Sequence, residues 1–294
     1  MNNLRRTLSL LLALVMLVAL GAFASVENSA AAEEAAVTLT DEDVASLSYL
    51  NGQLRVGMEC AYAPNNWQES EASDTNVPIE NVPGAYAEGY DVQIARIIAD
   101  QLGLELVVVK MDWDGLIEAL NQGQIDAIIA GMADTESRKE AINFTSPYHE
   151  TVYALMVNAG TQYENATSLA DFNGASVLGQ KDTALDWTID QIEGVNHLTA
   201  VASVPDMIAR LQQGTCDAIV INLENAPGYL AANPDFVVIS FPEGEGLDPG
   251  FKGACVGLRK SDDALLSLAD AVLATIDQEQ RDELWETALT NQPA

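Results

Sequence analysis

The chain has 294 residues, 48% of them hydrophobic, which is enough for one large or two modest domains with well-formed cores. Its 13 basic residues stand against 44 acidic ones, giving a net charge of −31 that argues against nucleic acid as a partner, because phosphate binding needs clustered cations. The excess of acid favours solubility in an exported or salty setting, or alternatively attraction of cationic solutes.

Residues 1–24 have the build of a secretory signal peptide. Arg5 and Arg6 precede an uncharged run that ends in Ala-Phe-Ala at residue 24. We expect cleavage there and a periplasmic or extracellular protein. The alternative is an uncleaved, membrane-tethering anchor, since residues 8–24 reach the short end of spanning length. Residues 25–48 are rich in Ala, Glu, Ser and Thr, and we expect a flexible leader.

From Leu54 onward, short apolar runs alternate with segments of helical period. We expect strands at 54–58, 104–110 and 125–131, and helices at 91–103 and 112–123. Asp91 and Asp112 stand where helix N-caps belong, and Gly103 and Gly123 where helices end. A second series follows Tyr153, with strands at 175–179, 197–201, 216–222 and 236–241 and helices at 183–192, 204–214 and 224–233. This pattern predicts an α/β fold with largely parallel strands.

One motif occurs twice, at residues 116–131 and 207–222. In both copies an amphipathic helix ends at a glycine, and an Asp-Ala-Ile sequence then opens a buried strand with Asp126 or Asp217. We interpret the shared part as scaffold. In open parallel sheets, ligands bind beyond the carboxyl ends of strands, so we expect a site just after each copy.

Candidate binding residues follow two of the predicted strands. After the first copy of the motif, a glycine-containing turn leads to Thr135, a predicted N-cap, and to Arg138, whose guanidinium can grip a carboxylate through two hydrogen bonds. The alternative is an Arg138 that pairs with surface acids. Glu59, Tyr62 and Trp67 follow the first strand, where the aromatic rings either stack on a ligand or belong to the core.

The chain offers little for metals or disulfides. Only His149 and His197 are present and neither has a close cysteine, so we expect no metal site and no cofactor. The acidic loop at 243–250 lacks regular calcium-ligand spacing and is interpreted as a solvated turn. Three cysteines, Cys60, Cys216 and Cys255, are expected to be buried free thiols, with a Cys216–Cys255 disulfide as the alternative.

Three stretches resemble one protein family. They are "GYDVQIARIIADQLG" from Gly89, "DWDGLIEALNQGQIDAIIAGM" from Asp112 and "ESRKEAINFTSPY" from Glu136. They are similar to the bacterial extracellular solute-binding proteins, family 3, which bind polar amino acids for ABC importers. The resemblance implies a two-lobed periplasmic-binding-protein fold of type II, with lobe 1 at 49–150 and 253–294 and lobe 2 at 151–252. A two-strand hinge would join the lobes near 146–153 and 250–254.

The resemblance also implies roles for individual residues. Arg138 would hold the ligand α-carboxylate, helped by the backbone of the turn and by Thr183. Tyr62 would stack on the ligand side chain, and Glu59 stands where relatives that take cationic amino acids place an acid. Asn222 replaces the acid expected for the ligand ammonium group, and Asp182 is a candidate for the missing charge. Ala133 and Gln93 also depart from the family pattern. The expected ligand-binding residues are Glu59, Tyr62, Trp67, Ala130, Gly131, Met132, Ala133, Arg138, Asp182, Thr183 and Asn222.

The function implied is capture of a polar or cationic amino acid between the lobes, followed by delivery to an ABC transporter permease. A monomer that is not an enzyme is expected. One alternative is a periplasmic enzyme on the same scaffold, dehydratase-like, with His149 and Glu150 near the first crossover as acid/base groups. The other alternative is a sensor ectodomain held by the amino-terminal segment.

Overall fold

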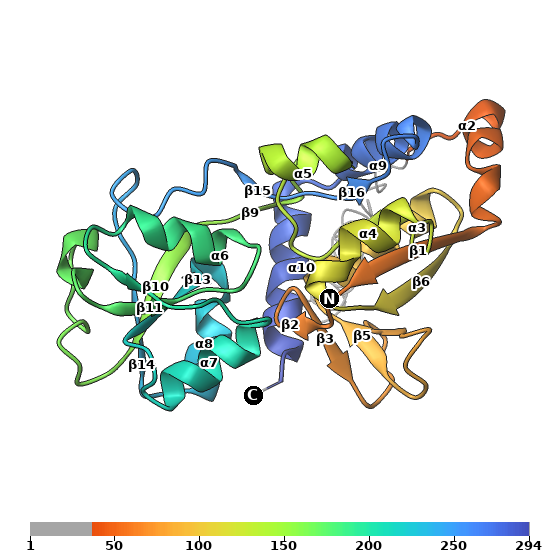
Figure 1. The fold of residues 1–294 in the computed structure, drawn as a ribbon. Helices are drawn as coiled ribbons and strands as arrows, with labels where there is room; N and C mark the ends of the chain where they lie inside the picture. Colours follow the sequence, from red (N-terminus) through yellow and green to blue (C-terminus); the bar gives the residue numbers. More distant parts are fainter. Residues whose placement is uncertain (1–36, 294) are drawn as a thin grey trace, which may run out of the picture. The chain divides into compact units, whose positions relative to one another are not determined.

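The computed structural model describes residues 37–293. The predicted signal peptide and the first part of the predicted leader lie outside these residues. The described chain builds two α/β lobes, each on its own five-stranded sheet (Figure 1). Among the described residues, no helix is both long and apolar enough to cross a membrane.

The first lobe is built on a sheet with the strand order β6-β1-β7-β16-β8. Its strands are β6 (Glu105–Lys110), β1 (Gln53–Met58), β7 (Ala127–Ile128), β16 (Gly257–Leu258) and β8 (Asn143–Phe144). β1 runs parallel to β6 and β7, whereas β16 is antiparallel to β7 and β8. Its helices are α3 (Tyr90–Gln101), α4 (Leu116–Asn121), α5 (Glu136–Ala141), α9 (Asp263–Thr275) and α10 (Gln278–Asn291). The two pairings of β1 are parallel, as predicted, and the two pairings of the late strand β16 are antiparallel, so the sheet is mixed.

A smaller antiparallel sheet projects from the first lobe. Its order is β2-β3-β5-β4, with β2 (Ala61–Tyr62), β3 (Asn66–Glu69), β5 (Tyr86–Glu88) and β4 (Val77–Pro78). The β2–β3 hairpin pairs Tyr62 with Asn66 and Ala61 with Trp67. This hairpin carries Tyr62 to the boundary between the lobes, because the Tyr62 ring packs against the core of the second lobe.

The second lobe has a sheet with the order β12-β11-β13-β10-β14. Its strands are β12 (Asn196–His197), β11 (Ser176–Leu178), β13 (Ala218–Asn222), β10 (Tyr153–Asn158) and β14 (Phe236–Ile239). β11 is parallel to β12 and β13, and β10 is antiparallel to β13 and β14. Its helices are α6 (Ala184–Trp187), α7 (Val204–Gln212) and α8 (Ala226–Ala232). The elements of the second series predicted from sequence are all present, with β10 added.

Two strands connect the lobes. β9 (His149–Glu150) leaves the first lobe and pairs antiparallel with β15 (Gly253–Ala254), on which the chain returns. The strands pass so closely that a Cβ on Gly253 would lie 1.9 Å from the His149 carbonyl oxygen. A glycine is therefore required where the two connections meet.

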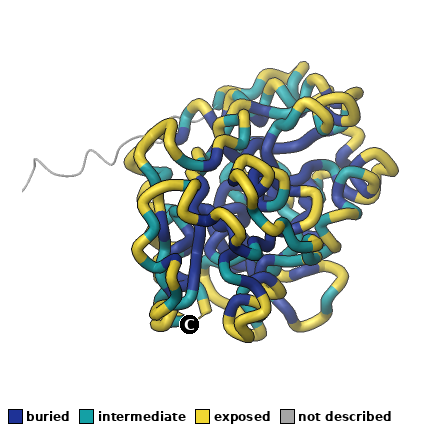
Figure 2. Tube along the Cα trace, turned by 60° about the vertical axis from the view of Figure 1, so that its left-hand side comes forward, coloured by how far each residue is buried: buried dark blue, intermediate teal, exposed yellow. Residues whose placement is uncertain are grey.

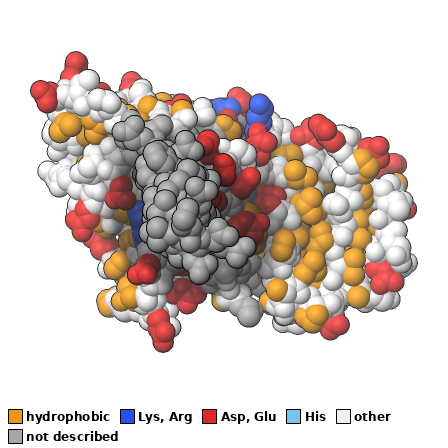
Figure 3. Space-filling view, turned by 180° about the vertical axis from the view of Figure 1, so that it is seen from behind, with side chains coloured by type: hydrophobic (Ala, Val, Ile, Leu, Met, Phe, Trp, Pro, Cys, Tyr) orange, Lys and Arg blue, Asp and Glu red, His pale blue; other side chains and the backbone are white. Residues whose placement is uncertain are grey.

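Each lobe has its own hydrophobic core (Figure 2). Leu54, Ile94 and Ile128 belong to the first core, and Leu155, Val177 and Ile219 belong to the second. Alternate faces of the strands and one face of each amphipathic helix meet in these cores. Seen from behind, the surface carries acidic side chains over both lobes and few basic ones (Figure 3).

The end of the predicted flexible leader is helical. Thr40 caps α2 (Asp41–Ser46) in a reciprocal capping box with Asp43, and Leu47 behind it is buried in the first core. A second local expectation was wrong. Gly89, not Asp91, is the N-cap of α3, and Asp91 lies inside the first turn. Its carboxylate is fully buried and serves the site described next.

Candidate functional site between the lobes

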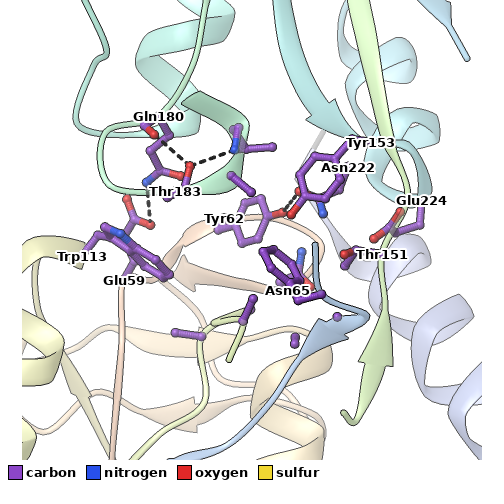
Figure 4. Close-up of a pocket in the computed structure, with 18 of the residues that line it drawn as sticks. Glu59, Tyr62, Asn65, Trp113, Thr151, Tyr153, Gln180, Thr183, Asn222 and Glu224 are labelled. Atoms are coloured by element: carbon purple, nitrogen blue, oxygen red, sulfur yellow. Dashed lines mark hydrogen bonds between the residues drawn. The ribbon is translucent and has the colours of Figure 1, made fainter. Parts of the chain in front are cut away.

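A small cavity of about 40 Å³ lies between the lobes, at the carboxyl ends of several strands. Residues after β1 and β7 line it from the first lobe, and residues after β11 and β13 line it from the second (Figure 4). Eight of the expected binding residues line it: Glu59, Tyr62, Ala130, Gly131, Ala133, Arg138, Thr183 and Asn222. A volume of this size holds a few water molecules and not an amino acid, so the lobes are closed on each other.

Four polar contacts hold the lobes closed. The Tyr62 hydroxyl donates to Asn222 Oδ1 at 2.5 Å, and Gln180 Nε2 donates to Glu59 Oε2 at 3.4 Å. At the rim, Lys181 forms an ion pair with Asp114. The fourth contact is made by Arg138, described below. Each contact joins one side chain or carbonyl from either lobe, so they must break for the cavity to open.

Arg138 lines the cavity and is held by backbone carbonyls of both lobes. Its two terminal nitrogens donate to Ala133 O at 2.9 Å and to Asp182 O at 2.8 Å. The ring of Trp113 lies against the guanidinium, with Arg138 Cζ 5.1 Å from the ring centroid. Burial lowers the pKa of Arg138 to about 10, which leaves it charged at neutral pH. Since a guanidinium has five N–H groups, further donors remain for an anion.

Glu59 supplies a carboxyl group to the cavity. Burial raises the pKa of Glu59 to about 7; the hydrogen bond from Gln180 opposes this shift, and the neighbouring acids Asp112, Asp114 and Asp206 add to it. A buried acid that ionises near neutral pH is ready to pair with a cation, because a positive group would restore the charged form.

The turn after β7 is fixed by a buried polar network. Gly131 N donates to the Tyr148 hydroxyl at 3.0 Å, and that hydroxyl donates to Asp91 Oδ1 at 2.7 Å. Asp91 Oδ2 accepts from Asn66 Nδ2 at 2.8 Å. Burial raises the pKa of Asp91, opposed by the hydrogen bonds from Tyr148 and Asn66. Because the Gly131 N–H is used here, it is not free for a ligand carboxylate.

Gly131 is needed at this turn for two reasons. Its φ is +66°, which other residues rarely adopt, and a Cβ would lie 3.1 Å from Tyr62 Cε1. The Tyr62 ring therefore lies directly on the glycine. Thr135 caps α5 as predicted, since its hydroxyl accepts from Arg138 N at 3.3 Å. The turn and the cap together set the position of Arg138.

The second-lobe residues are already engaged by protein groups. The Thr183 hydroxyl donates to Gln180 O at 2.8 Å and accepts from Leu185 N at 3.2 Å as the N-cap of α6. Asn222, the last residue of β13, accepts from Tyr62. A ligand that contacted Thr183 or Asn222 would therefore exchange with an existing partner.

Three expected residues do not line the cavity. Trp67 is 3% exposed in the first core and its Nε1 donates to Glu69, because its side chain leaves β3 on the core side. The Met132 side chain is buried, and its carbonyl accepts from Cys255 N. The Asp182 side chain points outward to Lys181 at 3.3 Å, since its φ of +58° turns the residue away from the cavity. Only its carbonyl reaches Arg138.

Sequence reasoning missed several side chains that line the cavity. They are Asn65, Trp113, Thr151, Tyr153, Gln180, Leu185, Glu224 and Phe251. Trp113 and Glu224 had a usable signal, because each follows the carboxyl end of a strand by a few residues. His149 and Glu150 do not line the cavity; the His149 ring stacks on Trp285 with centroids 4.3 Å apart, and Glu150 is exposed on the hinge.

Two α/β lobes on a two-strand hinge, with charged and aromatic side chains converging between them, define a ligand-binding protein of the type II periplasmic-binding class. A family model for bacterial extracellular solute-binding proteins, family 3, matches residues 54–287, and the chain belongs to this family. The family is extracytoplasmic, as its description says.

Individual relatives have low sequence identity to this chain. A probable histidine-binding protein of Campylobacter jejuni is 28% identical over 68% of this chain and 72% of its own length. The L-cystine-binding protein TcyJ of Escherichia coli is 26% identical over 90% of this chain and 89% of its own. Among solved structures, an amino acid ABC transporter substrate-binding protein from Streptococcus pneumoniae bound to L-arginine has a TM-score of 0.73 at 25% identity, covering 86% of this chain and 99% of that one.

Proposed function

We propose that this protein captures a cationic amino acid between its lobes and delivers it to an ABC importer in the cell membrane. The observation that carries the proposal is the set of charged side chains on the cavity, which comprises Arg138, Glu59 and Glu224. One guanidinium suits a carboxylate, and two carboxylates suit two positive groups. Similarity to proteins named for binding histidine, and to a structure with bound arginine, supports the same class of ligand.

In this proposal Arg138 grips the ligand carboxylate, and Tyr62 and Trp113 present aromatic faces to its side chain. Glu59 takes the cationic end of the side chain, where its raised pKa returns toward the ordinary value on pairing. The turn at 130–133 holds the Tyr62 ring and Arg138 in place. Its Gly131 N–H is bonded to Tyr148 and does not bind the ligand carboxylate.

Ligand capture needs an opening of the hinge. The bonds of Tyr62 to Asn222 and of Glu59 to Gln180 part, the ligand enters, and the lobes close again around it. Only contacts made to both lobes favour the closed form over the open form. The closed, liganded form is the one that the permease would recognise. The protein acts as a monomer outside the cytoplasm and performs no chemistry on the ligand.

A calorimetric titration with L-arginine, L-lysine, L-histidine and L-glutamate tests the proposal. We expect a basic amino acid to bind most tightly and glutamate to bind weakly or not at all. Tighter binding of glutamate than of all three basic amino acids would overturn it. Mass spectrometry of the bound ligand after prolonged incubation separates binding from catalysis, and an altered ligand would favour the enzyme alternative.

A further inference from the structure

The residue that follows α10 contacts the second lobe. The side-chain amide of Gln292 lies on Gly228 of α8, so closely that a Cβ on Gly228 would lie 2.0 Å from Gln292 Oε1 and 2.5 Å from Gln292 Nε2. Gly228 is buried and helical, and its φ is not positive, so the backbone conformation does not require a glycine. Because glycine weakens a helix relative to alanine, the helix does not require it either. The missing side chain makes room for the Gln292 amide.

The first lobe sets the position of Gln292. Ala288 of α10 is buried in the first core, and Trp285 packs against the same core. Gln292 N donates to Ala288 O at 3.0 Å, so Gln292 continues directly from the helix. At the other end of α10, Arg281 donates to the backbone carbonyl of Tyr148, next to the hinge strand β9. Gln292 therefore moves with the first lobe, whereas Gly228 moves with the second.

The contact between Gln292 and Gly228 is separate from the cavity. Neither residue is among the described residues that line the cavity. Both line a groove of about 570 Å³ between the β2–β3 hairpin of the first lobe and helices α7 and α8 of the second. Figure 1 shows α10 running from the hinge strands towards α8. A ligand in the cavity would therefore not touch this contact.

The length of α10 makes the contact sensitive to hinge motion. The helix has 14 residues and is therefore about 21 Å long, with the hinge at one end and Gln292 at the other. When two rigid lobes rotate about a hinge, surfaces at this distance from it separate or slide. The position of the Gln292 amide on Gly228 thus belongs to the closed form.

We infer that Gln292 and Gly228 form a latch that favours the closed form of the hinge without touching the ligand. A contact that exists only in the closed form shifts the open-to-closed ratio, and it does so equally for every ligand that the cavity takes. The latch goes beyond the proposed function, because it acts in the unliganded protein and does not depend on which ligand binds.

The population of the open form tests the latch. Single-molecule energy transfer between fluorophores on one exposed cysteine in each lobe, Asp100→Cys and Glu193→Cys, counts open and closed molecules without ligand. All variants are made on a Tyr62→Phe background, in which one closing contact is already removed. We expect Gln292→Ala and Gly228→Gln each to raise the open-to-closed ratio about two- to fivefold.

Matched variants separate the latch from a general effect on α8. Ala231→Gln adds the same side chain at an exposed position of this helix and should leave the ratio unchanged. Gln292→Ala combined with Gly228→Gln should give the ratio of Gly228→Gln alone, because both changes remove one and the same contact. Additive effects would contradict a direct contact. Melting temperatures of all variants report whether the lobes stay folded.

Ligand binding gives a second readout. In calorimetry with L-arginine, L-lysine and L-histidine, Gln292→Ala should weaken every amino acid that the wild type binds by one common factor, and unequal factors would contradict the latch. An unchanged open-to-closed ratio in both Gln292→Ala and Gly228→Gln would overturn it, whatever the ligand. If these variants open the hinge but the wild-type protein binds no basic amino acid, the proposed function fails and the latch stands.

Discussion

The hydroxyl of Tyr62 donates to Asn222 Oδ1 at 2.5 Å across the boundary between the two lobes. The two residues are 160 positions apart in the chain, and each is placed by a strand end of its own lobe. This bond closes the protein around a cavity too small for an amino acid. The free energy of the closed form therefore includes contacts that a ligand has to replace.

Removing this bond is expected to favour the open form. Tyr62→Phe keeps the ring on Gly131 and deletes one hydrogen bond, worth about 0.5–1.5 kcal/mol, so the open-to-closed ratio should rise about two- to tenfold. Small-angle X-ray scattering without ligand would show a larger radius of gyration than for the wild type. Tyr163→Phe, inside the second core, is the matched control and should scatter as the wild type does. Equal scattering by Tyr62→Phe would refute the expectation.

Arg138→Ala is expected to weaken binding of the cognate amino acid at least about tenfold, because a charge-assisted hydrogen bond contributes roughly 1.5–3 kcal/mol. Arg210→Ala removes an exposed arginine from α7 and should leave the affinity unchanged. Titration calorimetry of both variants measures the difference. Unchanged affinity in Arg138→Ala would remove this residue from the site.

Binding of a cationic ligand should depend on pH through Glu59. With a pKa of about 7 in the closed protein, Glu59 loses its charge as the pH falls, and with it the attraction for a positive group. Affinity is expected to fall by up to about thirtyfold from pH 8 to pH 5.5 for a single titrating carboxylate. Glu59→Gln should bind more weakly at pH 8 and lose most of this dependence. The same pH profile in wild type and variant would rule out Glu59 as its source.

The stability of the unliganded protein should depend on pH in the opposite direction from the ligand affinity. Burial raises the pKa of Glu59 from 4.5 to about 7, so the folded state holds the proton more tightly than the unfolded state. The stabilising contribution is complete below about pH 4.5 and is lost as the pH rises through 7. Relative to the wild type, Glu59→Gln should gain up to about 3 kcal/mol of unfolding free energy between pH 4.5 and pH 8. Urea unfolding at both pH values measures this gain, and a constant difference would contradict it.

The repeated Asp-Ala-Ile motif provides a test of stability in both lobes. Asp126 Oδ2 accepts from Arg55 N at 3.1 Å, and Asp217 Oδ2 accepts from Ser176 N at 2.7 Å, so each aspartate caps the start of the neighbouring parallel strand. Asp126 also pairs with the half-buried Arg259 at 3.0 Å.

Replacement by alanine should destabilise each lobe by about 1–3 kcal/mol. The loss should be larger for Asp126→Ala, because this change also removes one of the two carboxylates that pair with Arg259, the other being Asp262 at 2.8 Å. Denaturant unfolding of the two variants under one condition gives the comparison. A larger loss in Asp217→Ala than in Asp126→Ala would show that the ion pair contributes nothing.

Much of the scaffold could be predicted from the sequence. The repeated pattern of a helix, a glycine and a buried strand correctly predicted that β7 follows α4 and that β13 follows α7. This was possible because hydrophobic periodicity and helix stops are local signals. The exact lobe limits stay a prediction. The small β2–β5 sheet was not predicted, since its strands are two to four residues long. Asp91 was mistaken for a helix cap because its partners, Tyr148 and Asn66, are distant in sequence.

The site was harder to predict than the scaffold. Strand-end positions made Glu59, Tyr62 and Arg138 candidates with other roles left open, and the family resemblance then selected them; all three line the cavity. Trp67 was included because it is aromatic and close to Tyr62, yet strand alternation sends its ring into the core. The sequence did not show whether the Asp182 carboxylate faces the cavity, because this depends on the local backbone direction. The φ of Asp182 is +58°, and its carboxylate points outward to Lys181. Their roles in binding remain to be tested by the variants above.

The three thiols have a practical consequence for measuring hinge motion. Cys60, Cys216 and Cys255 are all buried and unbonded, and burial raises their pKa values to about 12, 11 and 12. Because the thiolate is the reactive form, these side chains should resist maleimide and spin-label reagents at neutral pH. One surface cysteine introduced on each lobe would then carry the labels selectively. Single-molecule fluorescence could therefore measure the opening of the hinge without replacement of the three native cysteines.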